Sequence, residues 1–142
     1  MTDLSSLIAR LEKAEGPSRY DDCHLWVIAK GGDARMRVCD SSTKDFVWER
    51  GIDGMWVRDV VKFSAVPKYT SSIDAAVSLA ERVLPGWMRS MTTGIGHTAA
   101  YVRDKSILDP SKIEGEGYHA TAAIALVLAT LRALDQKGSS NG

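Results

Sequence analysis

The segment from Ala120 to about Leu134 constrains the fold of this chain more than any other. Over roughly its first ten residues it is apolar on nearly every side of a helix, so it should be buried rather than half-exposed. Its longest apolar run, Ala122 to Ala129, is far shorter than the ~20 residues that cross a bilayer. The sequence therefore predicts a central buried helix with other elements packed around it.

Two further helices are predicted before residue 32. Apolar residues recur at helical spacing over Leu4–Leu11, and Gly16-Pro17 ends this pattern. Ser18 followed three positions later by Asp21 resembles a capping box. The second helix is expected to begin there and to end at Gly31-Gly32.

Period-two alternation and β-branched residues predict strands in two groups, separated by a helix. That helix is expected to carry a capping box at Ser71 and Asp74, with Ile73 on its apolar stripe, and to stop at Pro85-Gly86. Gly51 and Gly54 are expected to bracket one of the turns. The predicted strands are Ala34–Cys39, Phe46–Trp48, Met55–Phe63, Trp87–Thr93 and His97–Arg103.

This order of elements predicts one α+β domain, because hairpin-like connections favour a mainly antiparallel sheet with helices packed on it. The chain has 142 residues and shows neither an internal repeat nor a linker that would divide it. We expect a single domain over residues 1–137. The tail 138–142 is expected to be disordered.

The sequence Gly115-Glu116-Gly117-Tyr118-His119-Ala120 matches G-x-G-x-x-A ahead of the last helix. A dinucleotide site needs a strand before this motif and a parallel strand after the helix. A loop is expected before the motif, and too little sequence follows the helix. The motif is therefore interpreted as a glycine turn that starts a helix. A weaker alternative is an anion bound by backbone N–H groups at that helix start.

Composition argues against several function classes. Eighteen basic and eighteen acidic residues cancel, so no bulk charge favours nucleic acid or a membrane surface. Cys23 and Cys39 are too few for a secreted disulfide framework, and the N-terminus lacks a signal-peptide pattern. The ligand spacings of zinc sites and the motifs of nucleophilic catalysis are also missing. We therefore expect a soluble intracellular protein without metal, cofactor or catalytic residues.

Basic and aromatic residues interleave between positions 35 and 58. Such strand-borne residues could form a partner-binding surface or stack bases. The competing interpretation is that the tryptophans fill the core while the arginines face solvent, which strand alternation favours. The candidate partner-binding residues are Arg35, Arg37, Trp48, Arg50, Trp56 and Arg58.

A second candidate set surrounds the glycine motif. It combines the expected helix start with nearby strand residues that could hold a small, nucleotide-like anion. The candidate ligand-binding residues are Trp87, Arg89, Tyr101, Gly117, Tyr118, His119 and Thr121.

Three blocks, which cover somewhat under half of the chain, resemble the phage ABA sandwich domain family of small phage and prophage proteins. They are "LIARLEKAEGPSRYDD", "VPKYTSSIDAAVSLAERVLPGW" and "GEGYHATAAIALVLATLRAL". The resemblance implies a three-layer α-β-α sandwich with helices on both faces of the sheet. Ala122 stands where the family usually has proline, and the segment from about Lys30 to Ala65 matches no family pattern.

The resemblance implies a phage or prophage origin and a place in the host bacterial cytoplasm, and it transfers no activity. We expect a non-catalytic accessory protein that binds a host or phage protein, with nucleic acid and membranes not among its partners. The alternatives are a binder of a small-molecule ligand and, third, a small hydrolase using His97 and His119. A homo-oligomer joined through aromatics such as Trp26 or Tyr69 stays open.

Overall fold

The computed structural model describes residues 4–31, 34–40, 44–104 and 115–140. Helices and strands alternate in groups along the chain. Their bounds are α1 (Leu4–Lys13), α2 (Arg19–Lys30), β1 (Ala34–Asp40), β2 (Asp45–Ile52), β3 (Met55–Lys62), a short 3-10 helix (Phe63–Ala65), α3 (Ile73–Val83), β4 (Met88–Gly94), β5 (His97–Arg103), β6 (Gly115–His119) and α4 (Ala122–Ser140).

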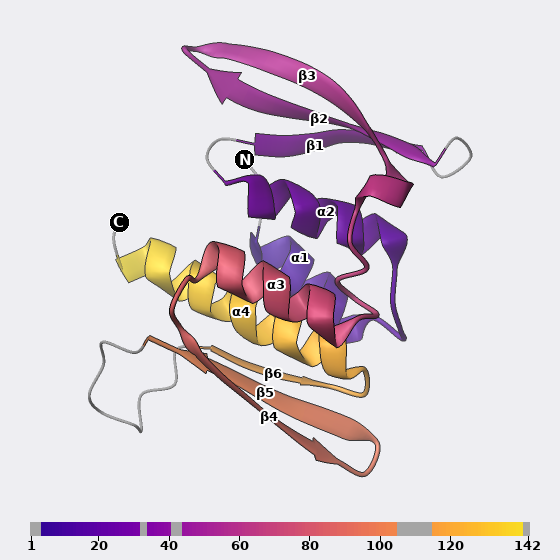
Figure 1. Cartoon of the computed structure of the whole chain (residues 1–142). Coiled ribbons are helices and arrows are strands. Elements are labelled where there is room, and N and C mark those ends of the chain that lie inside the picture. Colours follow the sequence, from indigo (N-terminus) through magenta and orange to yellow (C-terminus); the bar gives the residue numbers. More distant parts are fainter. Residues whose placement is uncertain (1–3, 32–33, 41–43, 105–114, 141–142) are drawn as a thin grey trace.

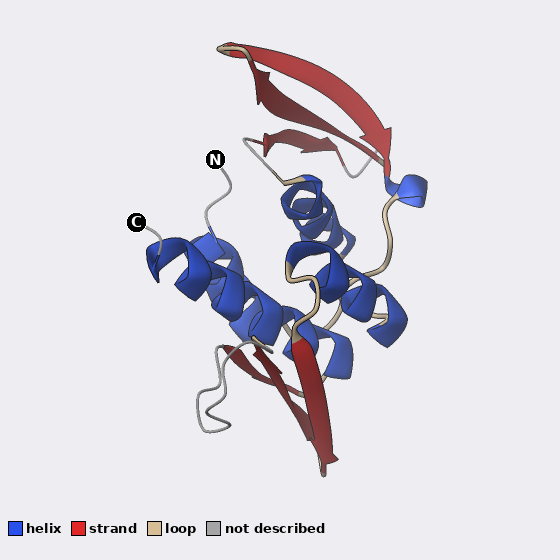
Figure 2. Ribbon diagram, turned by 60° about the vertical axis from the view of Figure 1, so that its left-hand side comes forward, coloured by secondary structure: helices blue, strands red, loops and turns tan. Residues whose placement is uncertain are grey.

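The strands form two separate antiparallel sheets. One has the order β1-β2-β3 and the other the order β4-β5-β6. Figure 1 shows the first sheet at the top and the second at the bottom, with the helices between them. Helix α2 lies against β1, and α4 lies on β5 and β6 while also contacting α1 and α3. The same arrangement of sheet, helices and sheet is visible in Figure 2.

The predicted α+β class and the antiparallel pairing are confirmed. The predicted order of layers is not what the described residues show. A single sheet with helices on both faces was expected, whereas two small sheets enclose the helices. The reason is the buried helix α4, which is covered by a sheet on one side and by α1 and α3 on another.

The core is built around α4, as its composition predicts. Ile124, Leu126 and Leu128 are fully buried, and so are Ala125 and Val127 between them. The hydroxyl of Thr130, also fully buried, donates to the carbonyl of Leu126 at 2.8 Å. The helix continues to Ser140, into the tail that was expected to be disordered.

The glycine motif is a strand, which corrects the prediction of a helix start. Gly115 and Gly117 lie in β6 on the side facing α4. A Cβ at Gly117 would overlap the carbonyl oxygen of Ala125 and lie 2.8 Å from the nitrogen of Ala129. These glycines are therefore required for close approach of strand and helix rather than for a left-handed turn.

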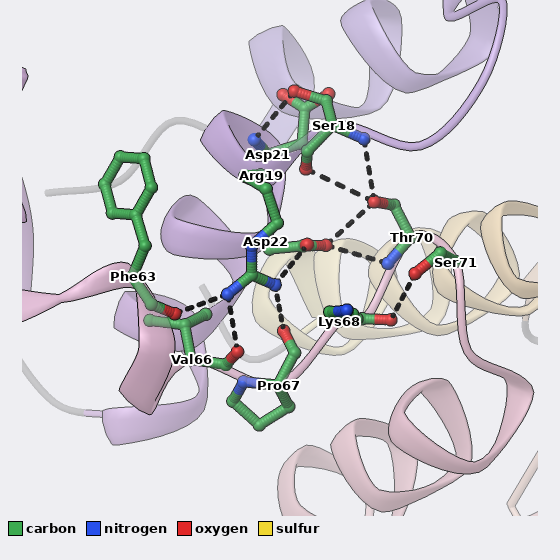
Figure 3. A network of polar contacts seen from close by, with 10 residues as sticks. All are labelled: Ser18, Arg19, Asp21, Asp22, Phe63, Val66, Pro67, Lys68, Thr70 and Ser71. Atoms are coloured by element: carbon green, nitrogen blue, oxygen red, sulfur yellow. Dashed lines mark hydrogen bonds and ion pairs between the residues drawn. The ribbon is translucent and has the colours of Figure 1, made fainter. Parts of the chain in front are cut away.

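A polar network joins α2 to the segment between β3 and α3 (Figure 3). The carboxylate of Asp22, 1% exposed, accepts from the backbone N–H and hydroxyl of Thr70, both at 2.8 Å, and from Arg19 Nη1 at 2.8 Å. Arg19 also donates to the carbonyls of Phe63 and Val66. Because Phe63 follows β3 directly, this network fixes the end of the upper sheet on the helices.

The N-termini of α2 and α3 show which serines cap these helices. Ser18 caps α2 as predicted, with its hydroxyl accepting from the N–H of Asp21 at 3.3 Å. For α3 the prediction is wrong by one residue, because Ser72 is the N-cap and accepts from the N–H of Ala75 at 3.2 Å. Ile73 accordingly faces outward and is 47% exposed, so it does not belong to the buried stripe.

Substitution of the two neighbouring serines should separate these alternatives. We expect Ser72→Ala to lower the free energy of unfolding by about 1 kcal/mol, because it removes the capping oxygen. Ser71→Ala should change it by less than about 0.5 kcal/mol, as is usual for an exposed position. Urea denaturation of both variants measures the difference, and a larger loss for Ser71→Ala would favour the cap predicted from sequence.

Candidate protein-binding surface

Strand β3 is exposed along nearly its whole length, unlike its neighbour β2. Every residue from Met55 to Lys62 is exposed except Val61, which is half-buried. The exposed side chains include Met55 (70%), Val60 (61%) and Val57 (51%). A strand this apolar is ordinarily covered on at least one face, so its exposure marks β3 as a candidate interaction surface.

The outer edge of β3 is unpaired among the described residues, since β3 pairs with β2 alone. Asp53 and Gly54, with φ of 50° and 81°, form the two-residue turn between them, so Gly51 lies in β2 rather than at the turn as predicted. In such hairpins the residues flanking the turn, here Ile52 and Met55, form a hydrogen-bonded pair. From Met55 onward, hydrogen-bonded and non-hydrogen-bonded residue pairs therefore alternate between β2 and β3.

This alternation decides which backbone groups face the free edge. Odd-numbered residues from Met55 to Val61 bond to β2, and the pattern continues where the N–H of Phe63 donates to the carbonyl of Lys44 at 2.9 Å. The N–H and C=O groups of the even-numbered residues then point outward. The residues whose backbone N–H and C=O groups point away from β2, toward the free edge, are Trp56, Arg58, Val60 and Lys62.

The face of this sheet toward the helices is apolar and only partly covered. Phe46 and Trp48 of β2 are buried there against Trp26 of α2, with ring centroids 5.5 and 5.0 Å from the Trp26 ring. Strand register places Met55 and Val57 on this same face, nearer the hairpin tip. Figure 1 shows that the tip extends past the helices, which explains why these two side chains are exposed.

The opposite face carries a charged cluster centred on Glu49. Its carboxylate is 3% exposed and accepts from Arg35 Nε at 2.9 Å and from Arg58 Nε at 2.7 Å. The guanidinium of Arg35 also stacks on the ring of Trp56, 3.8 Å from its centroid. Arg58 remains 67% exposed, so this face presents positive charge beside the free edge.

The structure divides the predicted partner-binding set between the two faces. Arg35, Trp56 and Arg58 come together around Glu49, which sequence reasoning missed. Trp48 lies on the other face and is buried, as the core interpretation expected, with Arg50 over its ring at 5.2 Å. The side chain of Arg37 lies outside the described residues.

The predicted ligand-binding set does not converge on one site. Trp87 and Arg89 line an open hollow of about 570 Å³ at the end of α3, where Arg89 pairs with Glu81 at 3.2 Å. Tyr101 and Tyr118 lie on the outer face of the lower sheet, with their hydroxyls 3.2 Å apart. Gly117 lies on the opposite face of that sheet, against α4.

His119 and Thr121, the other members of this set, serve a structural contact. His119 Nε2 donates to the carbonyl of Ala14 at 2.7 Å, and its Nδ1 accepts from the N–H of Thr121 at 2.9 Å. Both ring nitrogens are therefore occupied in linking the end of α1 to the turn before α4. His97, the other histidine of the hydrolase alternative, is exposed at the β4–β5 turn.

His24 on α2 gives the fold a pH dependence. Burial, and secondarily the charge of Arg10, lower its pKa from 6.5 to about 4. The unfolded chain therefore binds the proton more readily, and stability should fall as the pH drops from about 6.5 to about 4, by up to roughly 3 kcal/mol. Urea denaturation across this range measures the loss, and His24→Gln should flatten the pH profile.

No three histidine, cysteine, aspartate or glutamate side chains among the described residues are grouped so that they could hold a metal ion. In the same part of the chain, no helix has the length and apolar character needed to cross a membrane.

No protein-family model, no curated protein sequence and no solved structure matches the chain.

Proposed function

We propose that this protein is a non-catalytic binding module whose upper sheet, β1-β2-β3, recognises another protein. The observation that carries the proposal is β3 itself. It combines an unpaired edge with exposed apolar side chains on both faces. Strand edges of this kind accept an extended segment of a partner, which adds as a further strand.

The geometry favours this function over the two alternatives. For a small-ligand binder, the candidate residues would need to face one cavity, and they lie at separate places in the lower half of the molecule. For a hydrolase, His119 would need a free ring nitrogen, and both of its nitrogens are engaged.

The test compares sheet-face variants with a matched control. Met55→Ser and Val57→Thr reduce the apolar character of β3, and threonine keeps the preference for a strand. Ile95→Ser makes a similar change at the β4–β5 turn, where Ile95 is fully exposed. Each tagged variant is expressed in a bacterial host and its co-purifying proteins are identified by mass spectrometry, after circular dichroism has verified folding.

The proposal predicts a protein that co-purifies with the native sequence and with Ile95→Ser but is lost from the β3 variants. Retention of that protein by folded β3 variants would contradict it.

We further propose that the protein comes from a phage or prophage and acts in the bacterial cytoplasm. The support is the resemblance of three sequence blocks to the phage ABA sandwich domain family. The arrangement of two sheets around the helices adds no support for the family's layer order. The genes that flank this one test the proposal, since phage structural or regulatory genes should surround it.

A further inference from the structure

We infer that the free edge of β3 takes an extended protein segment in which acidic residues alternate with apolar ones. This inference rests on the proposed function and specifies the partner. It follows from the way in which the two faces of the sheet differ beside the edge.

Strand geometry sends alternate side chains of an added strand to opposite faces. On the outer face, the added side chains would lie beside Trp56, Arg58, Val60 and Lys62. The two cations lie opposite Glu49 and Asp45 of β2, and both remain exposed on the side of the free edge. Opposite charges across neighbouring strands stabilise the pairing and like charges destabilise it. Glutamate or aspartate therefore fits this face.

On the helix-facing side, the added side chains would lie beside Met55, Val57 and Val61. Apolar residues there would extend the core that Phe46 and Trp48 begin. Asp59 is the exception among the β3 residues of this face, which Arg50 of β2 shares. The Asp59 carboxylate accepts from the N–H of Val60 at 2.8 Å. A carbonyl of the partner strand would replace that local hydrogen bond.

A second copy of this chain fits the edge less well. Two antiparallel β3 strands related by a twofold axis pair each residue symmetrically about one position. Pairing centred on Arg58 or on Asp59 sets a charge against itself, and pairing centred on Val60 sets Arg58 against Lys62. Of the registers that overlap most of β3, only the one centred on Val57 avoids opposing like charges, so a different protein is the better occupant.

The test uses three capped nine-residue peptides. In the first, glutamate alternates with valine and tyrosine. The second replaces each glutamate with lysine. The third has the composition of the first in block order. Binding is measured by fluorescence anisotropy and located by the amide chemical shifts of Trp56, Arg58, Val60 and Lys62.

We expect the alternating glutamate peptide to bind at least about tenfold more tightly than either of the others, and to weaken as salt rises. Lys62→Glu should reduce its affinity about fivefold. Equal affinity for the glutamate and lysine peptides, or no binding of the glutamate peptide at millimolar concentration, would overturn the inference.

A proline substitution tests strand addition itself. Val60→Pro removes an outward N–H that β2 does not use, a position where edge strands tolerate proline. It should abolish peptide binding while the protein stays folded, and Val60→Thr should bind normally. Unchanged binding by folded Val60→Pro would overturn the inference. If Val60→Pro does not fold, Lys62→Glu decides alone.

The experiments distinguish failure of the inferred acidic partner from failure of the proposed function. The Met55→Ser and Val57→Thr variants could lose the natural partner while the protein shows no preference among the peptides. In that case β3 would still be the binding surface, but the inference of an acidic partner segment would be wrong. A stable dimer of the native protein in light scattering, with β3 amides protected, would instead assign the edge to a second copy.

Discussion

Replacing Gly117 with alanine is expected to lower the free energy of unfolding by roughly 3 kcal/mol or more. The new methyl group would overlap the carbonyl oxygen of Ala125 and lie 2.8 Å from the nitrogen of Ala129 and 2.9 Å from the Cβ of Leu128. Two of these neighbours are backbone atoms of α4, which no side-chain rotation can move. Relief therefore requires β6 to separate from the most buried helix of the protein.

Urea denaturation of Gly117→Ala measures the loss, and Gly16→Ala is its matched control. A Cβ at Gly16 would meet nothing within 4 Å. Alanine there should leave stability within about 0.5 kcal/mol or raise it slightly, because it restricts the unfolded chain. A loss of less than about 1 kcal/mol for Gly117→Ala would show that β6 and α4 do not approach as closely as described.

Asp22→Ala is expected to cost about 3–5 kcal/mol of stability. The substitution leaves the Thr70 N–H without its buried acceptor and leaves the Thr70 hydroxyl only the carbonyl of Ser18, at 3.2 Å. It also removes the carboxylate that Arg19 pairs with. A buried charge or donor left without its partner retains the full cost of its desolvation. The loss should appear as a lower urea midpoint.

Asp22→Asn separates the contribution of the Thr70 hydrogen bonds from that of the Arg19 ion pair. Its amide oxygen can still accept both hydrogen bonds from Thr70, while its NH₂ group would face the donors of Arg19. It should therefore cost clearly less than Asp22→Ala. Asp135→Asn, at an exposed position of α4, should stay within about 0.5 kcal/mol. Equal losses for Asp22→Ala and Asp135→Asn would contradict the network drawn in Figure 3.

Local pattern predicts most helices and strands of this chain. The stripe from Leu4, the cap at Ser18 and the strand His97–Arg103 all lie where the sequence indicates. These features depend on residues that are close together in the chain, so they can be predicted from the sequence without knowledge of the fold.

Strand β6 could not be predicted in the same way. Glycine disfavours strands, and two glycines in five residues predict a turn. The glycines are needed because α4 lies directly on this strand, a contact between residues that are not neighbours in sequence. The role of Glu49 also depends on contacts between strands, since its partners Arg35 and Arg58 lie on β1 and β3.

The register that assembles this cluster did have a sequence signal. Asp53-Gly54 is a strong two-residue hairpin turn, and placing the turn there pairs Glu49 with Arg58. Reading Gly51 as part of the turn concealed that pairing. The exposure of β3 had no such signal, because the length by which a hairpin extends past its helices is a property of the assembled fold.

Amide hydrogen exchange of the free protein tests the free edge of β3 most directly. If the edge is open, Trp56, Arg58 and Lys62 exchange rapidly, whereas Val57, Asp59 and Val61 are protected by their bonds to β2. Uniform protection of all six amides would show that another segment or a second copy already occupies the edge. That result would contradict the binding surface proposed for this protein.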